Sequence, residues 1–221
     1  MNGAGADASV MSGDNLGAKA GRPKGRWLVL VVAAVAGLGI GAGAFAWRLT
    51  AQQTQSAPAP SLIGGPFQMV DAQGRTVDQS LLKGKWTAVF FGYTYCPDVC
   101  PGTLQTLQAA TGQLGGRADD LQVVFVSVDP ARDTPEALRS YLASFEFPSG
   151  VHGLTGTPEQ VEAAAKAYRA YYRKRGEGPD YLMDHASTIY LMDPEGRFAR
   201  PVTGGMDPKA MAEQISAAMK A

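Results

Sequence analysis

The sequence predicts an α/β fold in which helices cover both faces of a central sheet, preceded by a single transmembrane helix. Three short apolar, β-rich runs, at residues 86–93, 121–128 and 187–192, predict central strands of that sheet. Strands that are apolar on both faces are typical of a sheet buried between two layers of helix. Amphipathic helical patterns lie between and after these runs. The composition, 45% apolar and 18% charged over 221 residues, supplies a core and excludes global disorder.

One continuous apolar segment, residues 27–47, carries no charge and has a Trp at each end. At about 1.5 Å per residue, a helix of this length spans the roughly 30 Å of a bilayer core. A cleaved signal peptide is the alternative, but its apolar core is usually only about 7–15 residues long. An Ala-x-Ala pattern, residues 42–44, lies inside the apolar run. We therefore predict an uncleaved membrane anchor.

The basic residues around this anchor predict its orientation. Arg48 alone follows the span closely, whereas four basic residues precede it: Lys19, Arg22, Lys24 and Arg26. The positive-inside rule then puts the N-terminus in the cytoplasm. Because the leader is not Arg-rich, we expect a bacterial cytoplasmic (inner) membrane protein with a periplasmic domain. The predicted parts are a cytoplasmic tail at 1–26, the anchor at 27–47, a polar linker at 48–61 and a folded domain at 62–221.

Helix starts in the folded domain share one pattern, a first-turn Pro preceded by a capping position. The four examples are Thr134-Pro135, Thr157-Pro158, Asp207-Pro208 and Cys100-Pro101. Turn sequences at 71–74 and 193–196 predict an early and a late hairpin. The resulting order of hairpin, strand, helix, strand, helices, hairpin and helix is thioredoxin-like.

The only two cysteines, Cys96 and Cys100, follow the first predicted central strand. Sites in open α/β sheets lie at the carboxyl ends of strands, so their position suits chemistry. We expect the helix dipole to favour the thiolate of Cys100, the form that attacks disulfides and binds metals. A structural disulfide is the alternative, but it would close only a short loop and would stabilise the chain weakly. The spacing therefore favours a redox or metal site.

His185 lies just before the third predicted central strand, in the loop that a thioredoxin-like sheet places against the cysteine loop. Thioredoxins have a Pro there, whereas this chain has none between Pro179 and Pro194. Two thiolates and one imidazole suit copper, because thiolates favour Cu(I) and imidazole suits both oxidation states. Zinc would want a fourth ligand, and the sequence offers no obvious one. His152, in a Gly-rich segment, is predicted to be an ordinary loop residue.

Three acidic residues are candidates for supporting the metal ligands. Asp98 and Asp184 are adjacent to them in sequence and could orient His185 or tune a thiolate. Asp129 ends the second central strand and could lie at the edge of the site, with a turn-forming role as the alternative. Residues 173–184 are expected to be a mobile loop that orders when His185 binds metal.

Three motifs together carry a family resemblance: FGYTYCPDVCPGTL, VSVDPARDTP and YLMDHASTIYLMDPEG. They resemble the Sco/SenC family over roughly residues 62–220. The resemblance implies a thioredoxin-like domain that binds copper, as Cu(I) or Cu(II), through Cys96, Cys100 and His185. It also implies assembly of the dinuclear copper centre of cytochrome c oxidase subunit II, by copper delivery, by reduction of its cysteines, or by both. The implied partners are that subunit, a copper donor chaperone and a thiol reductant such as a periplasmic thioredoxin-like protein.

Two enzymatic alternatives remain. A thiol–disulfide oxidoreductase would need only the Cys96/Cys100 pair and no obligatory metal, although the usual redox motif separates its cysteines by two residues. A peroxiredoxin-like peroxidase would want a Thr three residues before its Cys, where this chain has Tyr93, and Thr94 is one position off. Since 20 basic residues balance 20 acidic ones, no nucleic-acid partner is expected.

Overall fold

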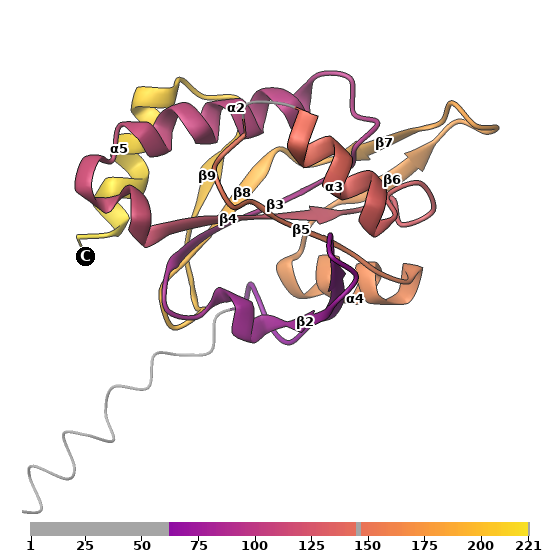
Figure 1. The fold of residues 1–221 in the computed structure, drawn as a ribbon, viewed down its shortest axis with the longest axis horizontal. Helices are drawn as coiled ribbons and strands as arrows, with labels where there is room; N and C mark the ends of the chain where they lie inside the picture. The colour runs from indigo at the N-terminus through magenta and orange to yellow at the C-terminus, as the bar shows by residue number, and fades with distance from the viewer. Residues whose placement is uncertain (1–61, 145–146, 221) are drawn as a thin grey trace, which may run out of the picture. The chain divides into compact units, whose positions relative to one another are not determined.

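A seven-stranded sheet organises residues 62–144 and 147–220, the part of the chain that the computed structural model describes (Figure 1). Strands β3, β4 and β5 run parallel, and β8 pairs antiparallel with β3. In spatial order the strands are β2 (Thr76–Asp78), β1 (Gln68–Asp71), β5 (His152–Thr155), β4 (Leu121–Ser127), β3 (Trp86–Gly92), β8 (Thr188–Met192) and β9 (Phe198–Thr203). The predicted central strands and both predicted hairpins are therefore confirmed.

Helices cover both faces of this sheet, as the sequence predicts (Figure 1). One face packs against α2 (Val99–Gly112), α3 (Pro135–Ser144) and α5 (Pro208–Ala218), and the other against α4 (Pro158–Tyr168). Two 3-10 turns, η1 (Gln79–Leu82) and η2 (Gly115–Asp120), complete the helical elements.

The side chains of β3 show why both faces are apolar. Phe90 faces the α2 layer, with its ring centroid 6.1 Å from that of Phe125 on β4. The next residue, Phe91, points to the other face and lies 5.4 Å from the ring of Tyr168 on α4. Because successive side chains of a strand alternate, each face of β3 buries its own apolar row.

The helix caps follow the predicted pattern with one exception. Thr157 and Gln160 form a full capping box at α4, and Asp207 accepts from two backbone N–H groups at α5. At α2, however, Asp98 occupies the cap and Cys100 lies inside the first turn, so the predicted cap at Cys100 is wrong. Pro101 is still tolerated because the first-turn N–H groups have no partner within the helix.

Two segments predicted as loops are strands. Half of residues 173–184 lie in a separate antiparallel hairpin of β6 (Tyr172–Arg175) and β7 (Leu182–His185), so the expected mobile loop is reduced to its tip. His152 begins β5, which is short and contains Gly153. A Cβ at that glycine would lie 2.7 Å from a terminal methyl carbon of Leu142 on α3, so the leucine side chain would have to shift.

The predicted anchor at 27–47 and linker at 48–61 lie outside the described residues. Across 62–144 and 147–220, no helix is both long and apolar enough to span a bilayer.

Candidate metal centre

The two cysteines come together where β3 ends and α2 begins. Cys96 lies in the connecting loop and Cys100 in the first turn of the helix. The turn aims the backbone N–H of Cys100 at the sulfur of Cys96, with 3.3 Å between N and Sγ. Cys96 is 8% exposed and Cys100 is fully buried, and both are free thiols. The four-residue spacing thus leaves one cysteine slightly exposed and the other fully enclosed.

His185, the last residue of β7, brings an imidazole to the same point. Its Nε2 lies 3.4 Å from the sulfur of Cys100 and 3.9 Å from that of Cys96. The three potential ligand atoms all lie within 4.8 Å of one another. In the described ranges no other group of three His, Cys, Asp or Glu residues converges in this way.

The surroundings of His185 fix its ring. Its Nδ1 lies 3.1 Å from the carbonyl oxygen of Ala186. A carbonyl can only accept, so Nδ1 donates to it, and Nε2 is the ring nitrogen that faces the two sulfurs. The rings of Phe90 and Tyr93 meet the imidazole edge to face, at centroid distances of 6.0 and 5.7 Å. The imidazole is therefore held in the tautomer and orientation that a metal ligand needs.

The two thiols have opposite acidities. The Cys100 side chain, hydrogen-bonded to Cys96, lowers the pKa of Cys96 to about 4, with help from His185 and the backbone N–H groups of Cys100 and Asp98. Burial raises the pKa of Cys100, and the neighbouring Cys96 thiolate raises it further. The expectation that the helix dipole favours a thiolate at Cys100 is therefore wrong, because desolvation outweighs the dipole at a fully buried sulfur.

Gly92, the last residue of β3, makes room for the buried thiol. A Cβ at this position would lie 2.6 Å from the sulfur of Cys100 and 2.7 Å from a ring carbon of Phe125. The end of β3 beside the cysteines is therefore closely packed, and only glycine fits at position 92.

The three predicted supporting carboxylates do not reach the ligands. Asp98 is exposed, and its carboxylate makes no capping hydrogen bond. Asp184 forms ion pairs with Arg173 and Arg175 across the hairpin, at 3.6 and 3.2 Å. Asp129 is buried, and its carboxylate accepts hydrogen bonds from Arg132 and Tyr181. Of these three, only Asp98 contacts the cluster, through its backbone N–H and not its carboxylate.

A carboxylate that sequence reasoning missed, Asp133, anchors the cysteine loop instead. It is fully buried and accepts hydrogen bonds from the backbone N–H and the hydroxyl of Thr94, and from the hydroxyl of Ser127. Burial raises its pKa. The segment that contains it is predicted as a helix start and belongs to one of the three family motifs, but neither pattern gives Asp133 a role. Its position after β4 was the available signal, because loops at the carboxyl ends of parallel strands converge.

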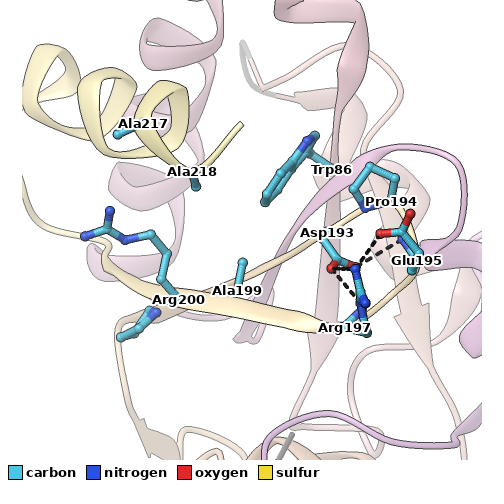
Figure 2. Close-up of a pocket in the computed structure, with 10 residues that line it drawn as sticks. Trp86, Asp193, Pro194, Glu195, Arg197, Ala199, Arg200, Ala217 and Ala218 are labelled. Carbon is cyan, nitrogen blue, oxygen red and sulfur yellow. Dashed lines mark hydrogen bonds and ion pairs between the residues drawn. The ribbon is translucent and has the colours of Figure 1, made fainter. Parts of the chain in front are cut away.

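A groove of about 660 Å³ lies at the opposite end of β3, beside Trp86 (Figure 2). The β8–β9 turn and α5 supply much of its lining, including Pro194, Ala217 and Ala218. Its most prominent charges pair with one another, since Arg197 binds both Asp193 and Glu195 (Figure 2). The groove contains no cysteine or histidine.

The fold and the cluster together define a class, a thioredoxin-like domain with a thiol–imidazole metal centre at the carboxyl end of β3. The donor set fits a soft metal, because two sulfurs and one neutral nitrogen can surround a copper ion without a fourth ligand. The chain matches the SCO1/SenC family over residues 55–220, and it belongs to that family. The resemblance recognised in the three motifs is therefore confirmed.

Known relatives agree with this assignment. Protein SenC of Rhodobacter capsulatus is 42% identical over 169 residues, which cover 76% of each chain. The structure of Bradyrhizobium japonicum ScoI with copper bound is 42% identical, with a TM-score of 0.63, and the match covers 70% of this chain and 98% of that one. BsSco, described as a Sco-family cytochrome c oxidase assembly protein with a disulfide switch, is 25% identical, with a TM-score of 0.59 and coverages of 74% and 96%.

Other relatives are longer. The chain spans 41% to 53% of four mitochondrial SCO proteins from Arabidopsis thaliana, Saccharomyces cerevisiae and Homo sapiens.

Proposed function

We propose that Cys96, Cys100 and His185 bind one copper ion, which the chain delivers to the dinuclear copper centre of cytochrome c oxidase subunit II. The observation that carries this proposal is the convergence of two sulfurs and the lone pair of one imidazole nitrogen within 4.8 Å. The copper-bound structure of a 42% identical relative supports the choice of metal. The description of BsSco as an oxidase assembly protein supports the target.

The reduced site is prepared for metal binding. Cys96 is already a thiolate near neutral pH, and Cys100 needs to lose its proton when the metal binds, so binding releases that proton. A disulfide between the two cysteines would remove both sulfur ligands. The redox state of the pair therefore decides whether the site can hold copper, and a thiol reductant switches it on.

The proposal also includes the localisation of the chain and the proteins that act on its copper site. Residues 27–47 anchor the chain in a bacterial inner membrane, with the N-terminus in the cytoplasm and the copper domain in the periplasm. A copper donor chaperone and a periplasmic thioredoxin-like reductant act on the site before subunit II does. Protease protection of the N-terminal tail in inverted and right-side-out vesicles tests the orientation.

A copper titration tests the ligand set. The reduced full chain in detergent is titrated against a competing Cu(I) chelator, beside the His185→Ala variant and a His152→Ala control. Wild type and the control should bind one copper equally, and His185→Ala should bind at least about 100-fold more weakly, since even outer-sphere changes cost roughly 10–100-fold. Equal affinity of wild type and His185→Ala would remove His185 from the ligand set.

A second function, disulfide reduction, is favoured by the asymmetry of the cysteine pair. The Cys96 thiolate attacks one sulfur of a substrate disulfide, which forms a mixed disulfide and releases the other substrate sulfur as a thiolate. The thiol of Cys100 then loses its proton and attacks the sulfur of Cys96, releasing the second substrate thiolate. The substrate gains two electrons and the pair becomes a disulfide.

Trapping separates the two functions. Cys100→Ser should accumulate a mixed disulfide at Cys96 with an oxidised subunit II peptide, and His185→Ala should reduce that peptide as fast as wild type. Loss of reduction in His185→Ala would show that the imidazole serves both activities.

A further inference from the structure

We propose that Arg132 is a positioning residue that clamps the hairpin bearing His185 onto the loop bearing Cys96. The proposal rests on the copper site proposed above. It concerns how the third ligand is held, a task that none of the predicted supporting carboxylates performs by direct contact with His185.

The hairpin needs an anchor. β6 and β7 pair only with each other among the described strands, and they form a sheet separate from the seven-stranded one (Figure 1). An isolated two-stranded hairpin is marginally stable in water. Contacts with the body of the domain must therefore decide where its last residue, His185, lies.

Arg132, in the segment between β4 and α3, makes the contacts to the hairpin. Its guanidinium carbon lies 3.6 Å from the ring centroid of Tyr181, and its Nη1 donates to the carbonyl of Pro179 over 3.3 Å. Tyr181 immediately precedes β7 and lies four residues before His185. A planar guanidinium stacked on an aromatic ring fixes both partners more firmly than a flexible ammonium would.

The same guanidinium also contacts the cysteine loop. Its central carbon lies 4.5 Å from the ring centroid of Tyr95 and 5.8 Å from that of Tyr93. Tyr95 directly precedes Cys96. One side chain, only 14% exposed despite its charge, thus lies between the two segments that carry the ligands.

Asp129 fixes the clamp to the body of the domain. Its carboxylate accepts from Nε of Arg132 and from the hydroxyl of Tyr181, both at 2.5 Å, and it is 3% exposed. The backbone of Asp129 is tied in turn to the hydroxyl of Ser127 at the end of β4. The carboxylate predicted to tune the metal ligands therefore acts two contacts away, through Arg132 and Tyr181.

The consequence is specific to the third ligand. Cys96 and Cys100 are held by the α2 turn and by the Asp133 contacts to Thr94, which Arg132 does not make. Tyr93 keeps two ties of its own to the hairpin, through the backbone of Met183 and the ring of His185. Removing the clamp should therefore loosen His185 and leave the thiol pair in place.

The test is a double-mutant cycle on Cu(I) affinity, measured by chelator competition with the reduced full chain. Arg132→Gln should weaken binding roughly 10-fold, the lower range for residues that orient metal ligands. In the His185→Ala background the same change should have no further effect, because the ligand that it positions is already gone. Arg117→Gln, at a partly buried arginine that bonds Ser216 on α5, is the matched control and should leave affinity unchanged.

Equal losses in both backgrounds would overturn the proposal, since Arg132 would then support the whole fold or the thiols. No loss in the wild-type background would overturn it as well. Tyr181→Phe, which keeps the ring, and Tyr181→Leu, which removes it, give a second pair: the Leu variant should match Arg132→Gln, and the Phe variant should stay closer to wild type.

Amide hydrogen exchange of the metal-free chain gives a readout that does not depend on copper. Arg132→Gln should speed exchange in β6 and β7 several-fold while β3 and β4 stay as protected as in wild type. Unchanged exchange in the hairpin would overturn the clamp. If wild type bound no Cu(I), the proposed function would fail, and this exchange measurement would still decide the clamp.

Discussion

The large groove and the potential metal ligands lie at opposite ends of β3. At Trp86 the strand begins beside an open groove of about 660 Å³. At Gly92 it ends against a sulfur, with no room for one additional carbon. The roomier end is lined by an aromatic ring, aliphatic carbons and charges that largely pair with one another, whereas the tighter end gathers two thiols and an imidazole.

The difference teaches that a donor set indicates function here better than a cavity does. A large pocket is the usual first candidate for a ligand site. A metal ion, however, needs little volume and several convergent lone pairs. Close packing serves that purpose, because it holds the ligand atoms in place before the ion arrives.

The strongest test of this contrast removes a sulfur. Cys100→Ser keeps the size of the buried side chain and its hydrogen-bonding capacity but replaces a soft donor with a hard one. Cu(I) affinity should fall by more than about 100-fold, because Cu(I) prefers thiolate over oxygen ligands. Chelator competition measures it, and near-wild-type affinity would mean that the buried sulfur is not a ligand.

Packing at the tight end can be tested with a single methyl group. Gly92→Ala places a carbon within 2.7 Å of two neighbours and should cost about 1–3 kcal/mol of unfolding free energy. Gly102→Ala, in α2 with nothing within 4 Å of its new carbon, is the matched control. The control should stabilise the chain by about 0.5–1 kcal/mol, because alanine is the better helix former. Urea unfolding of the reduced chain distinguishes them, and equal stabilities would contradict the close packing.

The pKa values of the two thiols predict an unusual pH dependence of their alkylation rates. With the Cys96 pKa lowered to about 4, its thiolate is fully formed above about pH 5 and is lost as the pH falls through 4. Its iodoacetamide reaction rate should therefore stay nearly constant from pH 5.5 to 7.5, where an ordinary thiol gains roughly 100-fold. Cys100, with its raised pKa, should stay unmodified over the same range. The urea-unfolded chain is the control, and a tenfold rise per pH unit at Cys96 would refute the assignment.

The smallest effect is expected at the groove. Arg200→Gln changes a residue in the middle of β9 that lines the groove. Copper affinity should change less than about twofold, and unfolding free energy by at most about 0.5 kcal/mol, as for substitutions away from special features. A large loss of copper affinity would mean that the two ends of β3 are coupled, which would break the comparison.

Much of the fold could be predicted from the sequence because its signals are local. The apolar runs and the Thr157 capping box specify structure through neighbouring residues, and both are as expected. The strands β5, β6 and β7 were missed because their sequences, HGLT, YRKR and LMDH, contain no apolar run, and the β6–β7 pair is held by tertiary contacts.

The candidate site likewise has residues that local sequence signals identify and residues whose roles depend on tertiary contacts. Cys96, Cys100 and His185 are rare residue types at strand ends, so composition and order single them out. Contacts between residues far apart in the sequence decide the roles of Asp129, Arg132 and Asp133. Tyr181 lies 52 residues from Asp129, and Thr94 lies 39 residues from Asp133. Sequence spacing carries no information about such pairs, and Asp98 and Asp184, next to the ligands in sequence, direct their carboxylates elsewhere.

If the chain delivers copper as proposed, the complete burial of Cys100 sets an order for the transfer. Cys96 is 8% exposed and His185 is half-buried, so the side of these two residues is the one from which solvent and a partner's side chains can approach the cluster. An incoming ligand therefore exchanges first with one of these two, and the bond to Cys100 is the last to break. Loading would follow the reverse order, so the enclosed sulfur of Cys100 would be the last to join the ion.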